Sequence, residues 1–236
     1  MSRPIAVIDL GRRRYGEVLE LQRDLCRRRL SGELTEDLLL LVEHDPVVTL
    51  GRSTKESSLP VPRKLLEARG LEIFEVERGG DVTLHAPGQL VGYPILDLTG
   101  FRQDLHWYLR QTEEVLIRGL ADLGVTAERN PGKTGVWTSG RKIASIGIHV
   151  KQWVTLHGFA LNLTTDLSLF DLIVPCGIAG VTMTSVARER GGAEDVLHHE
   201  ARAAVVHRFG EVFDRPMEER PGAREVPGDS LAPRAG

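Results

Sequence analysis

The chain has 236 residues, enough for one large domain or two small ones with a well-buried core. Its 30 basic and 33 acidic residues leave a net charge of −3, which argues against nucleic acid as the main partner. No stretch approaches the ~20 apolar residues that span a bilayer, no signal peptide is evident and two distant cysteines make no disulfide framework, so we expect a soluble cytoplasmic protein with no membrane partner.

Apolar patterning divides the chain into short strands and a few helices. Alternation or short apolar runs predict strands at residues 4–10, 37–43, 47–50, 71–76, 82–85, 90–98, 125–129, 135–138, 143–150 and 154–163. Helical spacing predicts helices at residues 15–30, 63–69, 103–123 and 194–213. This mixture predicts an α+β fold with a mixed, mostly antiparallel sheet and packed helices.

Two further expectations concern pairing and boundaries. Tight turns join the strands at residues 82–85 and 90–98, which predicts that these two pair antiparallel, because a parallel connection needs a dozen residues or more. Residues 1–214 are expected to form a single domain. Residues 215–236 are rich in proline, glycine and charge with little to bury, so we predict a disordered tail.

Cys176 lies in a Pro-Cys-Gly turn that follows an apolar run. Proline restrains the backbone before the thiol and glycine permits a sharp turn after it, an arrangement that can present a nucleophile. The ordinary alternative is a buried structural cysteine. Cys26, on the apolar face of the helix predicted at residues 15–30, is interpreted as such a buried side chain.

Lys142 is the candidate partner of Cys176. Only five of the 30 basic residues are lysines, so a lysine beside an apolar strand invites a chemical explanation, since lysine can release its proton and arginine does not. A nearby ammonium lowers the pKa of a thiol, and the amine could move a proton in both halves of an acyl transfer. The alternative is an exposed lysine at the end of a strand.

His85 and His157 sit beside glycine-containing turns, in LHAPG and LHGFA. Either could serve Cys176 as a catalytic histidine, but we favour a role in shaping a pocket by hydrogen bonding. No spacing of histidine and cysteine matches a zinc site, so we expect no metal and no cofactor. The absence of a P-loop, a dinucleotide fingerprint and a nucleophile elbow argues against a Rossmann-fold oxidoreductase and a serine hydrolase.

Five motifs, in the same order, resemble the octanoyltransferases of lipoate biosynthesis, also called lipoyl(octanoyl) transferases. The motifs are LVEHDPVVTLGR (residues 41–52), RGGDVTLHAPGQLVGYPI (78–95), KIASIGIHV (142–150), LHGFALNL (156–163) and DLIVPCG (171–177). Each motif alone is weak, whereas the joint match is highly specific. One departure is Ala86, where the family usually has glycine, and its methyl group could narrow the pocket beside His85 and alter acyl-chain preference.

The resemblance implies a single catalytic domain of the biotin/lipoate protein ligase-like fold and an ATP-independent cytoplasmic enzyme. Such an enzyme moves an octanoyl group from octanoyl-acyl carrier protein to a specific lysine of lipoyl domains, in 2-oxoacid dehydrogenase E2 subunits and the glycine cleavage H protein. Cys176 would carry the acyl group as a thioester, and Lys142 would tune it and shuttle protons. The positions that match the family's substrate-binding segments are Arg78, Gly79, Gly80, Asp81, Val82, Thr83, Leu84, His85, Ser145, Ile146, Gly147, Gly158, Phe159 and Ala160.

Three other functions stay open. An ATP-dependent lipoate or biotin ligase of the same fold would need a basic, glycine-rich loop for the adenylate, whereas residues 78–85 offer one arginine and a neighbouring acid, Asp81. An amidotransferase of this fold would take its acyl group from an already modified carrier domain. A module that only binds carrier domains would not need Cys176.

Overall fold

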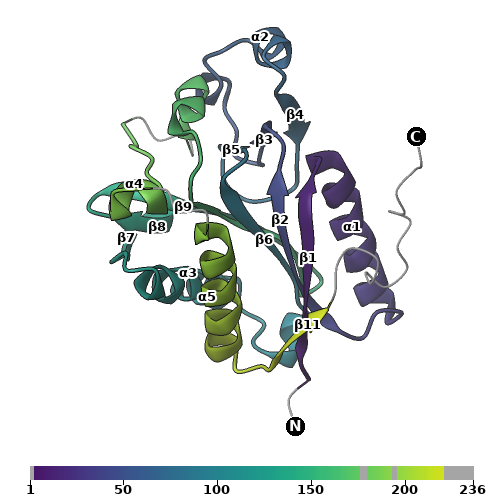
Figure 1. Ribbon diagram of the computed structural model, residues 1–236. Coiled ribbons are helices and arrows are strands. Elements are labelled where there is room, and N and C mark those ends of the chain that lie inside the picture. Colours follow the sequence, from purple (N-terminus) through teal and green to yellow (C-terminus); the bar gives the residue numbers. More distant parts are fainter. Residues whose placement is uncertain (1–2, 176–179, 193–195, 221–236) are drawn as a thin grey trace, which may run out of the picture.

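The computed structural model describes residues 3–175, 180–192 and 196–220 of the chain. Within these residues, the main feature is an eight-stranded sheet with the strand order β11-β1-β2-β6-β10-β9-β8-β7 (Figure 1). Its strands in that order are Met217–Arg220, Ile5–Arg13, Asp37–His44, Gln89–Ile95, Val154–Asn162, Arg141–Lys151, Lys133–Thr138 and Glu128–Asn130. Within this eight-stranded sheet only β1 pairs in parallel, with β2 and β11, so the predicted mixed, mostly antiparallel sheet is confirmed.

A second, smaller sheet and the helices complete the fold. The small sheet has the order β4-β3-β5, formed by Glu72–Glu75, Val47–Leu50 and Val82–His85. The α-helices are α1 (Tyr15–Ser31), α2 (Arg63–Ala68), α3 (Leu105–Asp122), α4 (Val186–Arg190) and α5 (Leu197–Phe213), and 3₁₀ turns lie at Glu56–Ser58, Leu98–Gly100 and Leu167–Leu172. The four predicted helices are all present.

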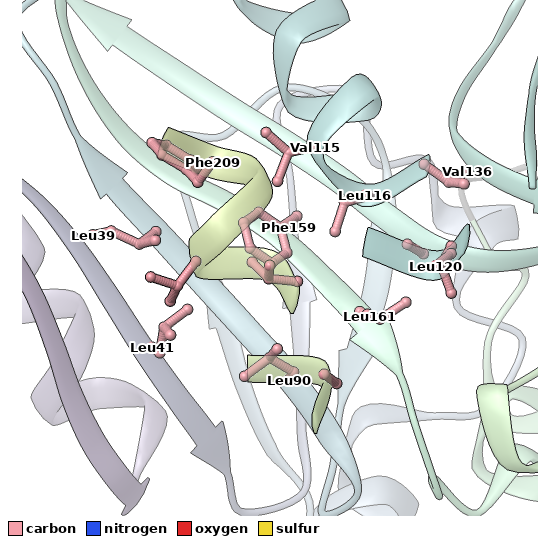
Figure 2. Packing of buried hydrophobic residues seen from close by; sticks show 14 of the residues in the cluster. Leu39, Leu41, Leu90, Val115, Leu116, Leu120, Val136, Phe159, Leu161 and Phe209 are labelled. Atoms are coloured by element: carbon pink, nitrogen blue, oxygen red, sulfur yellow. The ribbon is translucent and has the colours of Figure 1, made fainter. Parts of the chain in front are cut away.

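The large sheet is covered on both faces. Side chains of a strand alternate between the faces, so in β2 Leu39 and Leu41 face one core while Leu38, Leu40 and Val42 face the other. The first core packs against α3 and α5, and Figure 2 shows Val115, Leu116, Leu120 and Phe209 of these helices around Phe159 and Leu161 of β10. The second core packs against α1, on the opposite side of the sheet in Figure 1.

The predicted pairing of β5 with β6 is wrong. β5 pairs antiparallel with β3 in the small sheet, and β6 pairs antiparallel with β2 and β10 in the large one. The chain therefore passes from the large sheet into the small one between β2 and β3, at Asp45-Pro46, and back into the large sheet between β5 and β6, at residues 86–88. A tight turn read from sequence does not distinguish such a sheet-switching corner from a hairpin.

The predicted boundary of the disordered tail is also wrong at its start. Met217–Arg220 form β11, which lies parallel to β1 with Ile5 opposite Met217. Arg220 also forms an ion pair with Glu36, at 2.7 Å. The rest of the predicted tail, residues 221–236, lies outside the described residues. In the described ranges, none of the helices has the length and apolar character needed to cross a membrane.

Candidate active site

A cavity of about 230 Å³ lies where the two sheets meet. One wall is β5 together with the residues that lead into it, and the other is the middle of the β9–β10 hairpin. Tyr15 at the start of α1, Tyr93 of β6 and residues 132–134 at the start of β8 complete the lining. Cavities of this kind, apolar with a few convergent polar groups, are the usual location of a small-ligand site.

Most of the site residues predicted from the sequence line this cavity. They are Arg78, Gly80, Asp81, Val82, Thr83, His85, Lys142, Ser145, Ile146, Gly147, Gly158, Phe159 and Ala160. Gly79 and Leu84 do not line it: the Gly79 N–H donates to the carbonyl of Ile148 at 2.9 Å, and Leu84 is buried in the core of the small sheet. Cys176 lies outside the described residues, so its distance from Lys142 stays a prediction.

Lys142 is buried rather than exposed at a strand end. It is the second residue of β9, and only 1% of its surface is accessible. Its Nζ lies 5.6 Å from the centroid of the Trp137 ring. Gly135 makes room for this side chain, because a Cβ at that position would lie 2.6 Å from Lys142 Cε. A buried cation at a cavity wall is a strong candidate for chemistry, since burying a charge is costly.

Both chain segments that flank Cys176 are attached to the cavity wall. On the N-terminal side, the Val174 N–H donates to the carbonyl of Ser58 at 2.9 Å, and the Ser58 hydroxyl donates to the carboxylate of Asp81 at 2.7 Å. On the C-terminal side, Lys142 N–H donates to Thr182 O and Thr184 N–H donates to Lys142 O, both at 2.9 Å. These contacts attach Val174, through Ser58, to Asp81, and attach Thr182 and Thr184 to Lys142; Asp81 and Lys142 both line the cavity.

Arg78 places a second buried cation in the lining. It is 6% exposed, and its Nη2 donates to the carbonyl of Thr49 at 2.7 Å and to the Thr49 hydroxyl at 2.9 Å. Two glycines make space for it: a Cβ at Gly51 would lie 2.7 Å from its Nη1, and a Cβ at Gly147 would lie 2.9 Å from its Cδ. The glycines of the sequence motifs therefore serve a close approach between backbone and arginine.

His157 lies at the cavity in an unusual backbone conformation. Its φ is +59°, in the left-handed region that non-glycine residues rarely occupy, and its N–H donates to Gln22 Oε1 at 2.9 Å. Burial lowers the pKa of its imidazole. Its Nε2 lies 3.7 Å from a carboxylate oxygen of Glu77, and this imidazole together with Arg23 holds the pKa of Glu77 well below its usual range. His157 therefore forms part of the cavity wall, and a role in shaping the pocket by hydrogen bonding stays a prediction.

Sequence reasoning missed two tyrosines and the turn at residues 132–134. Tyr15 counted only as an apolar helix position and Tyr93 only as part of a strand, so neither carried a signal of its own. The Tyr93 hydroxyl lies 2.8 Å from His44 Nε2, and His44 Nδ1 lies 3.0 Å from the carbonyl of Arg13. Because a carbonyl only accepts, Nδ1 carries the hydrogen and Tyr93 donates to Nε2. Burial lowers the pKa of His44 to about 4, so this contact persists at neutral pH.

The described residues show no cluster of metal ligands at this site. Over the described ranges, with Cys176 not among them, no group of three or more His, Cys, Asp and Glu side chains could hold an ion. The polar side chains that line the cavity include Lys142, Arg78, Asp81 and His85.

Comparison with known proteins agrees with this fold. The model of the lipoyl protein ligase A/B catalytic domain matches residues 14–210. An octanoyltransferase of Gloeobacter violaceus is 47% identical over 220 residues, which cover 93% of this chain and 94% of that protein. An octanoyltransferase of Geobacter sulfurreducens is 48% identical over 215 residues, covering 91% and 87%.

Among solved structures, a lipoate-protein ligase A bound with ATP superposes with a TM-score of 0.69 at 16% identity, covering 93% of this chain and 89% of that one. At that identity the likeness establishes the ligase-like fold alone. The sequence matches are far closer and extend over nearly the whole chain. The chain therefore belongs to the lipoyl protein ligase A/B catalytic domain family and, within it, to the octanoyltransferases of lipoate biosynthesis.

Proposed function

We propose that this octanoyltransferase takes its acyl group from octanoyl-acyl carrier protein, holds it as a thioester on Cys176 and passes it to a specific lysine of a lipoyl domain. The acceptors are the lipoyl domains of 2-oxoacid dehydrogenase E2 subunits and the glycine cleavage H protein. Lys142 completes a cysteine–lysine dyad. No ATP is consumed, because exchange between thioesters costs little free energy and the final amide is much more stable than a thioester.

One observation carries the proposal: Lys142 is buried at the cavity wall, and the segments on both sides of Cys176 are attached to that same wall. Thr182 and Thr184 bond to the backbone of Lys142 itself, and Val174 is tied through Ser58 to Asp81. An ion pair between Arg141 and Glu189, with the Thr184 hydroxyl donating to the same carboxylate, holds the C-terminal segment on β9. These contacts favour a thiol delivered to the cavity over a cysteine buried elsewhere.

Lys142 gives and receives the protons that this transfer requires. The Cys176 thiolate attacks the thioester carbon, and the Lys142 ammonium gives its proton to the departing pantetheine thiolate. The amine of the acceptor lysine then attacks octanoyl-Cys176, the C–S bond breaks, and Lys142 takes one proton from the attacking nitrogen. The thiolate and the ammonium are thereby restored. Residues 78–85, 145–147 and 158–160 would bind the acyl chain and offer backbone N–H groups to the oxyanion.

Intact-mass spectrometry after mixing the enzyme with octanoyl-acyl carrier protein, without ATP, tests this function. We expect one octanoyl adduct on the Cys176 peptide, which disappears when a lipoyl domain is added while that domain gains the octanoyl group. A parallel reaction contains octanoate and ATP instead and should give no transfer. An enzyme that forms no adduct and modifies the lipoyl domain only from octanoate and ATP would be a ligase.

Gly135→Ala should impair acylation more than it impairs folding. Gly135 has a φ of +119°, and an added Cβ would lie 2.6 Å from Lys142 Cε and from the carbonyl of Ala144, so Lys142 must move. We expect the single-turnover rate of octanoyl-enzyme formation to fall by ~10-fold or more, with a stability loss of about 1–3 kcal/mol.

Gly140→Ala, in the turn that joins β8 to β9, is the matched control. Its φ is +75° and no atom lies within 4 Å of an added Cβ, so it carries the backbone strain without the contact to Lys142. Thermal unfolding and acylation rates of the two variants separate the effects. Equal acylation rates at equal stability would show that the space beside Lys142 is not needed.

A further inference from the structure

Three buried polar side chains form a row beside the cavity and have no part in the cysteine–lysine chemistry. His85 ends β5 and lines the cavity, Gln89 begins β6 and Asn162 ends β10. His85 Nδ1 lies 3.2 Å from Gln89 Oε1, and Gln89 Nε2 donates to Asn162 Oδ1 at 3.0 Å. Their exposed fractions are 7%, 1% and 1%, so the row is built into the core rather than laid on the surface.

Two backbone carbonyls set the direction of every hydrogen bond in this row. Asn162 Nδ2 donates to the carbonyl of Thr184 at 2.9 Å, and Gln89 Nε2 donates to that of Leu84 at 3.1 Å. A carbonyl can only accept, so each amide has one orientation that makes its bonds. Gln89 Oε1 is then an acceptor, and the hydrogen it receives must sit on His85 Nδ1. The row therefore specifies the Nδ1–H tautomer of His85.

Nε2 of His85 is left with a lone pair for a ligand. Over residues 3–175, 180–192 and 196–220, the bond to Gln89 is the side chain's one hydrogen bond. Burial, with help from His44 and Arg78, holds the pKa of His85 well below its usual range, so the ring stays neutral near pH 7. Tyr15 stacks on the ring at 5.8 Å between centroids and fixes its plane.

The same wall offers a second acceptor. The Tyr93 hydroxyl donates its hydrogen to His44. Toward a ligand in the cavity, the hydroxyl oxygen can therefore only accept a hydrogen bond. An octanoyl chain brings no N–H or O–H donor to such atoms. The amine of the acceptor lysine does bring N–H donors, and it must reach the thioester carbon in this cavity for the second half of the reaction.

We propose that His85 accepts, through Nε2, a hydrogen bond from the ε-amine of the acceptor lysine and orients that amine for attack on the octanoyl thioester. The inference rests on the proposed function, because it needs an octanoyl-Cys176 intermediate. Gln89 and Asn162 are positioning residues that act through His85.

In the aminolysis step the nitrogen of the acceptor lysine forms the new C–N bond. The C–S bond breaks, and its electron pair leaves on the Cys176 sulfur. Of the two hydrogens on the attacking amine, one passes to Lys142 and the other remains in the amide. His85 holds the hydrogen that remains. Because its imidazole is a weak base here, it directs the nitrogen lone pair toward the carbonyl carbon without removing a proton.

Nitrogen-15 NMR of histidine-labelled enzyme tests the tautomer directly. The His85 signals, assigned with a His85→Gln variant, should report a protonated Nδ1 and an unprotonated Nε2 at pH 7. Gln89→Met removes the acceptor of the Nδ1 hydrogen and should shift the signals toward a mixture of tautomers. A wild-type enzyme with the hydrogen on Nε2 would overturn the proposal.

Two substitutions of His85 test its role in each half-reaction. The amide nitrogen of asparagine replaces Nδ1 but nothing replaces Nε2, whereas glutamine places an amide oxygen near the position of Nε2. Octanoyl-enzyme formation, measured by single-turnover mass spectrometry, gives each variant its own reference rate, and thermal unfolding reports whether it is folded; the loss in aminolysis must exceed any loss in this first step. Aminolysis by a lipoyl domain should fall ~10- to 100-fold in His85→Asn and recover at least in part in His85→Gln.

The outcomes separate this inference from the proposed function. Equal losses in both half-reactions, or equal aminolysis losses in both variants, would reduce His85 to a residue that shapes the cavity and would overturn the inference. The proposed function itself fails only if wild-type enzyme forms no octanoyl adduct, and that result would remove the basis of both.

Discussion

Cys176→Ala is expected to abolish the covalent octanoyl adduct and to lower octanoyl transfer by ~10⁴-fold or more. The physical reason is that the variant has no nucleophile to divide the reaction into two steps. The remaining route is direct attack by the lipoyl-domain lysine on the carrier-bound thioester, without an intermediate. Intact-mass analysis and transfer rates from octanoyl-acyl carrier protein measure both effects.

Cys26→Ala is the matched control, because Cys26 is the second of the two cysteines in the chain. Cys26 lies on α1, 3% exposed, and burial raises the pKa of its thiol, so it is a poor nucleophile. The variant should keep the adduct and the transfer rate. An adduct that survives in Cys176→Ala and disappears in Cys26→Ala would contradict the assignment of the nucleophile.

Lys142→Met is expected to lower both half-reactions by ~10²- to 10⁴-fold, the range over which a positioned acid–base group contributes. Methionine fills similar space but carries no charge and no proton. Lys142→Arg should also lose ~10²-fold or more, because a guanidinium does not release its proton at working pH. Arginine is also larger, and the lysine chain already lies close to Gly135 and the Trp137 ring. Single-turnover rates of acylation and aminolysis measure each step.

Lys133→Met gives a comparison at the same aromatic ring. Lys133 Nζ lies 5.4 Å from the Trp137 centroid, slightly nearer than Lys142 Nζ at 5.6 Å, but its side chain is only partly buried. Loss of a charge near this ring should therefore cost less than ~10-fold if proton transfer is the task of Lys142. Near-wild-type turnover in Lys142→Arg would instead reduce Lys142 to a positive charge that favours the thiolate.

Much of the fold could be predicted because its signals are local. The leucines of α3 recur at helical spacing, and the structure buries Leu116 and Leu120 against the large sheet. β9 and β10, two of the predicted strands, form a hairpin with Gly147 opposite Gly158, which brings two of the predicted site segments together. Cys26 is buried on α1, as its place on the apolar helix face indicated.

The errors arise where the outcome depends on distant residues. β5 pairs with β3, which begins at Val47, thirty-five residues before the start of β5 at Val82. This pairing forms because the bend at Asp45-Pro46 directs β3 out of the large sheet. The sequence of Met217–Arg220 is typical of a charged tail, yet this segment pairs in parallel with the edge of β1. Arg220 also forms an ion pair with Glu36. Neither the edge nor the carboxylate is visible in a local window of sequence.

By itself the sequence determined the kinds of groups at this site: a thiol between proline and glycine, a lysine in an arginine-rich chain, and glycines in the motifs that meet at the cavity. The tertiary structure alone decided that Lys142 is buried at the cavity wall and that Gly135 leaves room for it. It also decided that Gln89 and Asn162 set the tautomer of His85. Residue chemistry is a property of each side chain, whereas burial, space and hydrogen-bond direction depend on segments that only folding brings together.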